Sequence, residues 1–107
     1  MDNHCVVVWT TISRTADSHK IASALVSERL AACVNVLAQM ESVYRWKGEV
    51  ESDFERQLIM KTTATRVPAL KARLFQLHDY EVPEFIVTPI VDGSDAYLNW
   101  IRESTAG

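Results

Sequence analysis

The chain has 107 residues, of which 48% are hydrophobic and 23% charged, as is usual for one soluble globular domain. Its formal net charge of -3 gives no general attraction to nucleic-acid phosphates or anionic lipid, which disfavours nucleic acid and membrane as partners. No apolar run approaches the roughly 18 residues of a membrane span, and the start, MDNHCVVVWTT, lacks the basic region of a signal peptide. We therefore expect a single domain over residues 1–107, located in the cytoplasm.

The first predicted elements are a strand and a helix. Residues 6–12 are β-branched or aromatic without polar alternation, which indicates a buried central strand. Asp17 or Ser18 can cap the helix that follows. Its apolar stripe at helical spacing is Ala22, Leu25, Val26 and Leu30.

A long hairpin is predicted next. Residues 33–37 have strand character, and residues 42–46 resume it after an interruption at 38–41. Residues 47–48 (Lys-Gly) supply the turn, because glycine adopts positive φ without steric cost. The returning strand, 50–63, is polar on one face in its first half and apolar on both faces in its second half.

The last third of the chain predicts a helix, a strand and a short terminal helix. The second helix begins near residue 65, because Pro68 is tolerated only in a first turn, and it ends around residue 78. Its stripe is Leu70, Leu74 and Leu77. The last strand covers 85–90, where Pro89 favours a sheet edge or a strand end. The terminal helix is capped by Ser94 or Asp95 and carries Tyr97, Leu98, Trp100 and Ile101.

This order of elements predicts an α+β fold of the ferredoxin-like βαββαβ class, an antiparallel sheet with both main helices on one face. The opposite face then has no cover of its own. A central strand that is apolar on both sides cannot leave one side to water. The pattern therefore predicts an oligomer.

The length of the hairpin also favours an oligomer. A domain of this size is roughly 34 Å across, whereas an unbroken strand over 50–63 would span about 46 Å. The hairpin must overhang, bend or bulge. Tyr44, Trp46 and Phe54 near its tip would lie in solvent unless a partner covers them. The alternative is a bulged hairpin that folds back on its own chain.

The two cysteines, Cys5 and Cys33, are predicted to be free thiols. Both fall at the starts of strands that are separated by a third strand, which places them about 10 Å apart and beyond the reach of a disulfide. A cytosolic chain also normally keeps its thiols reduced.

Five segments along nearly the whole chain resemble the CutA divalent-cation-tolerance family. They are LAACVNV (30–36), YRWKGEVE (44–51), QLIMKTT (57–63), YEVPEFIVTPI (80–90) and DAYLNWI (95–101). The resemblance implies a ferredoxin-like fold related to the PII signalling proteins and a homotrimer interlocked through the long hairpins. It also implies a non-enzymatic role in tolerance of copper and other divalent cations, with no required cofactor.

The chain departs from the family pattern where copper ligands have been proposed. His78 is followed by Asp79 instead of proline. Thr10 stands where some bacterial members have a first-strand cysteine, and Leu77 stands where they have a second histidine. The thiol and imidazole donors that the resemblance implies are therefore incomplete.

The remaining candidate metal ligands are His78, Cys33 and Glu84, brought together across a subunit boundary to bind copper or another divalent cation weakly. Each has a structural alternative. Cys33 fits a small buried packing residue, and His78 fits a cap at a helix C-terminus. Met60 is predicted to belong to the core and not to a metal site.

A second candidate site is the loop before the last strand. Tyr80, Glu81 and Glu84 could bind a cation or a small ligand in a cleft between subunits that Trp46 and Lys61 could also reach. The alternative is a solvated acidic turn that only positions the strand.

Three other functions fit the same topology. Acylphosphatase activity would need a glycine-rich phosphate cradle, and Arg14 follows the first strand without one. RNA recognition would need a basic and aromatic signature, whereas the third strand contains FERQLIMKT. A PII-like small-molecule sensor or a trimeric scaffold is the third.

Overall fold

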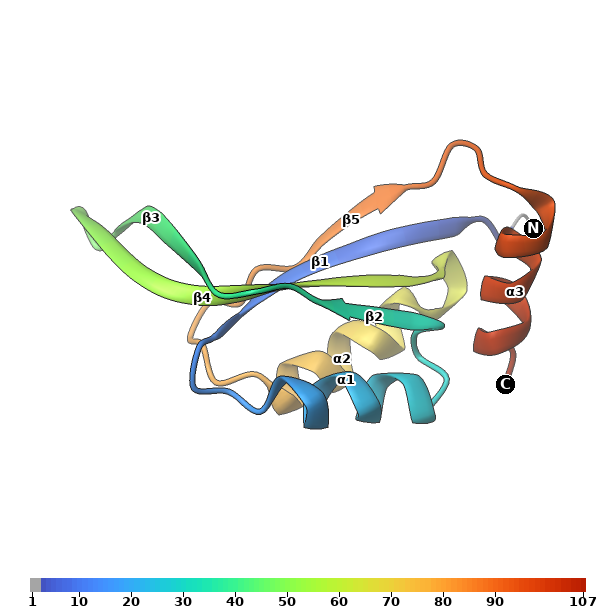
Figure 1. The fold of residues 1–107 in the computed structure, drawn as a ribbon, viewed down its shortest axis with the longest axis horizontal. Helices are drawn as coiled ribbons and strands as arrows, with labels where there is room; N and C mark the ends of the chain where they lie inside the picture. Colours follow the sequence, from blue (N-terminus) through green and yellow to red (C-terminus); the bar gives the residue numbers. More distant parts are fainter. Residues whose placement is uncertain (1–2) are drawn as a thin grey trace.

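One antiparallel sheet organises the protein, as seen in a computed structural model that describes residues 3–107 (Figure 1). In chain order the elements are β1 (Cys5–Ser13), α1 (Ser18–Ser27), β2 (Cys33–Val36), β3 (Met40–Trp46), β4 (Glu49–Thr63), the 3-10 turn η1 (Ala64–Arg66), α2 (Val67–Leu77), β5 (Ile86–Pro89) and α3 (Asp95–Thr105). The strands run in the order β2-β4-β1-β5, and β3 pairs with the other end of β4. The prediction of an α+β protein with an antiparallel sheet is confirmed.

The main core lies between the sheet and the pair of helices α1 and α2, which cover the same face (Figure 1). Opposed residues of antiparallel strands point to the same side of a sheet. Val8 therefore faces this core together with its partner Met60, and both are fully buried. Leu70 and Leu74 of α2 complete the core from the helical side, as the predicted stripe required. Met60 is a core residue.

Helix α1 buries a different face from the predicted stripe, and Leu30 of that stripe lies beyond its end at Ser27. Asp17 caps it by accepting a hydrogen bond from the Lys20 backbone N–H at 3.0 Å. The buried residues are Ile21 and Leu25, whereas Val26 is 41% exposed. The prediction for Val26 is wrong because consecutive residues lie about 100° apart around a helix, so the face set by Ile21 and Leu25 excludes it.

The hairpin extends beyond the two helices. Strand β4 pairs with β2 through residues 58–61 and with β3 through residues 49–55. Strand β3 begins at Met40, so the predicted interruption at 38–41 is too long, because Met40 already pairs with Glu55. Lys47 and Gly48, with φ of 50° and 84°, form the predicted turn.

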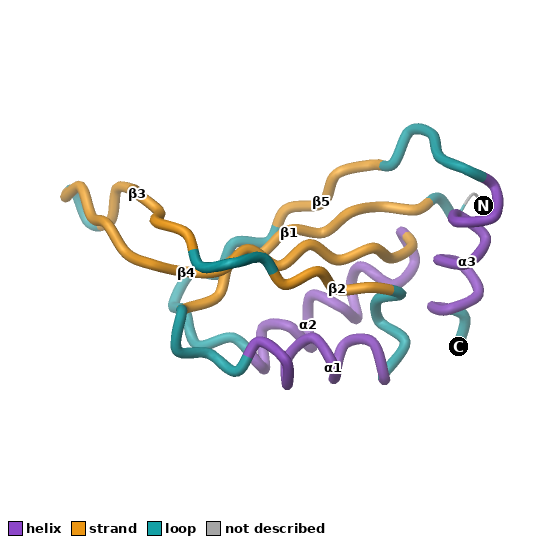
Figure 2. The backbone as a smooth tube through the Cα atoms, viewed as in Figure 1, coloured by secondary structure: helices purple, strands orange, loops and turns teal. Residues whose placement is uncertain are grey.

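The overhang sets the shape of the molecule. Figures 1 and 2 show the β3–β4 hairpin curving away from the helical layer, and the molecule measures 44 Å along its longest axis against 26 and 23 Å across. Val43 and Val50 on this hairpin are each 66% exposed. The predicted overhang is confirmed, and the alternative of a hairpin folded back on its own chain is not what the structure shows.

The opposite face of the sheet is covered only in part. Helix α3, capped by Ser94, packs at the end of the sheet where β1 begins, around Cys5 and Ile101. It has eleven residues and is longer than predicted. Farther along, Trp9 and Ile59 point to this face and remain half-buried. Within one chain, apolar side chains are thus left with incomplete cover.

Other predictions concern single features. Strand β5 is an edge strand that ends at Pro89, as predicted, although it is shorter than 85–90. Cys5 and Cys33 are free thiols on strands separated by β4. Among residues 3–107, no helix combines the length and apolar content needed to cross a membrane.

Candidate functional site

A hollow of about 660 Å³ lies between one face of the hairpin and the loop of residues 78–85 that joins α2 to β5. We call it the acidic hollow. The described residues that line it include no lysine, arginine or histidine. They include five carboxylates: Asp53, Glu55, Asp79, Glu81 and Glu84.

Three aromatic rings share the lining with these carboxylates. Tyr44 and Trp46 are two residues apart on β3, and alternation along a strand turns both to the same face. The register sets them opposite Glu51 and Glu49. Tyr80 approaches from the loop. The hollow therefore combines aromatic walls with negative charge.

The loop is held where β5 stops pairing with β1. That pairing ends at Trp9, whereas β1 continues to pair with β4 as far as Ser13. The Thr11 carbonyl faces the β5 side of the strand, as the Cys5 carbonyl does, so it needs another partner if it is not to stay unpaired inside the protein. The side-chain amide of Gln57 donates to the Thr10 carbonyl at 2.8 Å, and the His78 ring to the Thr11 carbonyl at 2.6 Å. The Thr10 hydroxyl in turn donates to the Glu84 carbonyl at 2.7 Å. The His78 side chain thus takes the place of the missing strand, and Gln57 and Thr10 add further bonds to the loop and to β1.

His78 is the centre of this support. Its side chain is fully buried. Because Nε2 faces a carbonyl, it carries the hydrogen, and Nδ1 accepts the backbone N–H of Tyr80 at 3.2 Å. Both ring nitrogens are therefore occupied within the chain. The imidazole bonds to β1 and to its own loop, so a metal ion at either nitrogen would have to displace one of these bonds.

Two of the carboxylates also have partners on the floor of the hollow. Glu84 accepts a hydrogen bond from Gln57 at 2.8 Å, and Glu55 accepts one from the Tyr80 hydroxyl at 3.0 Å. Burial, this bond and the charge of Glu55 raise the pKa of Tyr80 well above its ordinary value of 10.0. Since amides and phenols are neutral, the negative charge of both carboxylates remains.

The predicted metal ligands are not gathered within one chain. His78 and Glu84 are bonded near the end of β1, whereas Cys33 is half-buried at the start of β2, opposite Lys61. No group of three or more His, Cys, Asp or Glu residues that could hold a metal ion is found among residues 3–107.

Most residues of the predicted cleft come together within one chain, and its position between subunits stays a prediction. Trp46, Tyr80, Glu81 and Glu84 line one hollow, but Lys61 lies elsewhere and donates to the Asn35 side chain. The lining contributed by β4 was missed: Asp53, Glu55 and Gln57. Its signal was present in the sequence, because these polar residues alternate along the strand on the face that also carries the hairpin aromatics.

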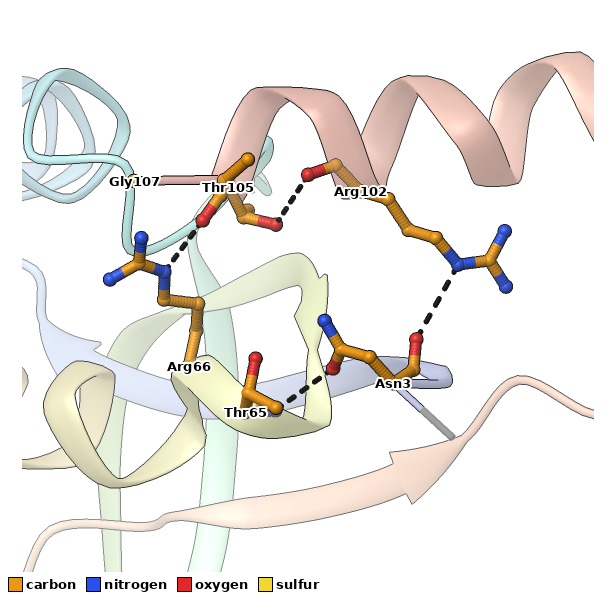
Figure 3. Close-up of a pocket in the computed structure, with 7 residues that line it drawn as sticks. Asn3, Thr65, Arg66, Arg102, Thr105 and Gly107 are labelled. Carbon is orange, nitrogen blue, oxygen red and sulfur yellow. Dashed lines mark hydrogen bonds between the residues drawn. The ribbon is translucent and has the colours of Figure 1, made fainter. Parts of the chain in front are cut away.

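A smaller pocket of about 290 Å³ lies between η1 and α3 (Figure 3). Its two arginines already have partners: Arg66 donates to the Thr105 carbonyl at 2.6 Å and Arg102 to the Asn3 carbonyl at 3.4 Å (Figure 3). These bonds join η1, α3 and the segment before β1. We interpret this pocket as structural.

Comparison with known proteins agrees with this small α+β fold. Residues 6–104 match the family model described as CutA1 divalent ion tolerance protein. The divalent-cation tolerance protein CutA of Thermus thermophilus is 48% identical over 99 residues, covering 92% of this chain and 96% of that one. The chloroplastic protein CutA of Arabidopsis thaliana is 44% identical over 100 residues, and the match covers 94% of this chain but only 55% of that one.

Comparison with solved structures also identifies CutA proteins. The crystal structure of CutA1 from the psychrotrophic bacterium Shewanella sp. SIB1 superposes with a TM-score of 0.92 at 34% identity, over the whole of both chains. The fold thus defines a class of small proteins with an antiparallel sheet, two helices on one face and a projecting hairpin. The chain belongs to the CutA family of divalent-cation tolerance proteins.

The environment of Tyr80 leads to a titration prediction. Tyrosinate absorbance of the wild type minus that of Tyr80→Phe should place the Tyr80 midpoint above pH 10.0, and Glu55→Gln should lower it by removing the adjacent charge. Because the pKa is raised in the folded state, the stabilisation is complete below about pH 10 and is lost as pH rises through the folded midpoint. A midpoint at or below the ordinary value would contradict the assigned bond.

Proposed function

We propose that the protein is a non-enzymatic homotrimer that serves divalent-cation tolerance, copper included, by binding a metal ion or a small ligand weakly at clefts between subunits. The observation that carries this proposal is the acidic hollow, which opens beside a hairpin too long for its own chain to cover. We further propose that residues 1–107 act as one ferredoxin-like domain in the cytoplasm. Two free thiols fit a reducing compartment.

Trimerisation is supported by surfaces that one chain leaves open. Strands β2 and β5 are both edges of the sheet, and an unpaired edge is a template for another chain. Val43 and Val50 are exposed on the hairpin, and Ile86 is half exposed on β5. Large apolar side chains left exposed in this way favour an interface. The strand order β5-β1-β4-β2 and the two helices on one face support the ferredoxin-like assignment.

Metal binding is proposed through His78, Cys33 and Glu84, as the family resemblance implied. Since these three do not meet within one chain, a site that uses them must be completed by a neighbouring subunit. Thr10 uses its hydroxyl to hold the loop, and Leu77 packs against the core, so neither can add a donor. Weak affinity follows from the small number of soft donors.

The second candidate function is that of a PII-like small-molecule sensor. The aromatic rings of the hollow favour it, because pockets of this volume with aromatic walls are typical of small-ligand sites. The remaining alternatives have less support. Arg14, the arginine that an acylphosphatase would need, lies over the Phe54 ring at 5.9 Å. A scaffold would not need a charged hollow.

The trimer has a direct test. Sedimentation equilibrium should give three times the chain mass of 12.1 kDa over a wide range of protein concentration. Replacing Val43 and Val50 together with serine should shift the distribution towards smaller species, because both side chains would lose a covered apolar environment. Val26→Ser, on the outer side of α1, is the matched control. A stable wild-type monomer would defeat the trimer.

The metal proposal is tested by calorimetric titration with copper(II) and zinc(II). The wild type should bind copper more tightly than zinc, as the Irving-Williams order requires. His78→Ala and Cys33→Ala should each weaken copper binding, while His19→Ala, on the exposed side of α1, should leave it unchanged. If both variants bind copper as the wild type does, these residues are structural and the assigned ligands are wrong.

A further inference from the structure

The carboxylates of the acidic hollow create a negative electrostatic potential, but they do not form a metal-coordination site. Five of them line it, yet no three acidic, histidine or cysteine residues among 3–107 come close enough to share a metal ion. A divalent metal needs several oxygen or nitrogen donors in direct contact. Glu55 and Glu84 in addition direct an oxygen each at Tyr80 and Gln57. Within one chain, the charge is spread around the hollow.

The aromatic lining offers direct contact to a cation, which the scattered carboxylates alone do not. Trp46 is 38% exposed and Tyr44 is 43% exposed, so both rings present surface at the hollow. The Trp46 ring already accepts a cation: the Lys47 ammonium lies 5.6 Å from its centroid. A cation over an aromatic face is attracted by the ring quadrupole, and aromatic walls are the usual means of binding quaternary or methylated ammonium groups.

We propose that the acidic hollow binds an organic ammonium ion, held by the faces of Trp46, Tyr44 and Tyr80 within the field of the surrounding carboxylates. Such an ion carries its charge on a large, weakly hydrated group, so it needs aromatic contact and negative potential and no set of converging donors. The inference rests on the proposed function, because it names the ligand class of the same hollow.

Size and charge both agree with this ligand class. The volume of about 660 Å³ lies within the roughly 300 to 1,000 Å³ of small-molecule pockets, and it exceeds what a bare metal ion would fill. With no basic residue among its described lining, the hollow repels anions.

The test uses the full assembled chain and two probes of equal shape. Choline carries a trimethylammonium group, and 3,3-dimethylbutan-1-ol carries a neutral tert-butyl group in its place. Binding is followed by calorimetry and by the indole N–H signals of the three tryptophans. Trp46→Leu removes a wall of the hollow, and Trp100→Leu, on α3 and 42% exposed, is the matched control.

Choline should bind about tenfold more tightly than the neutral alcohol and should shift the Trp46 signal saturably. Trp46→Leu should weaken choline binding by about tenfold, and Trp100→Leu should leave it unchanged. Should Trp46→Leu fail to assemble, the Trp46 signal of the wild type with both probes decides alone. Equal affinity for the two probes, or no saturable shift of Trp46, would overturn the proposal.

The copper titration separates this inference from the function on which it rests. If the protein binds copper but not choline, the organic-ammonium proposal is wrong and the metal proposal stands. If it binds choline but not copper, the assigned metal ligands are wrong and an organic ammonium ion is the ligand of the hollow. Absence of both removes the hollow as a ligand site.

Discussion

The structure depends on a difference in length: strand β4 extends well beyond the two helices that cover the sheet. Strand β4 has 15 residues, and only its second half, around Leu58 and Met60, lies over α1 and α2. Residues 49–54 pair with β3 alone. A two-stranded hairpin is at best marginally stable in water without further packing. The overhang therefore lacks cover within one chain, and it also forms one wall of the acidic hollow.

The other wall depends on satisfying the backbone carbonyl of Thr11 on the β5 side of β1. Because β5 starts pairing only at Ile86, His78 takes over as hydrogen-bond donor to this carbonyl, Gln57 donates to the neighbouring Thr10 carbonyl, and Glu84 is held through Thr10. This explains why polar residues sit at the edge of an apolar core. The same bonds that fix the loop keep the carboxylates facing the hollow, so fold and site share one hydrogen-bond network.

The sequence predicted the elements well because their signals are local. The apolar run of β1, the Lys47-Gly48 turn and the stripe with Leu70 all lie within one element. Val26 was misplaced because helical spacing alone leaves two neighbouring faces possible, and only packing chooses between them. His78 was considered a cap or a ligand. Its bond to Thr11, 67 residues away in the chain, has no local signal, and for the same reason the pairing of Tyr80 with Glu55 could not be predicted.

We propose above all that other copies of the chain hold the hairpin in place. Hydrogen exchange of the assembled protein measures this most directly, residue by residue. The amides of residues 43–46 and 49–54 should be protected nearly as strongly as those of Val8 and Leu58 in the core, because a covered hairpin opens only when the assembly does. Exchange at the rate of an isolated hairpin, with the core still protected, would contradict the claim.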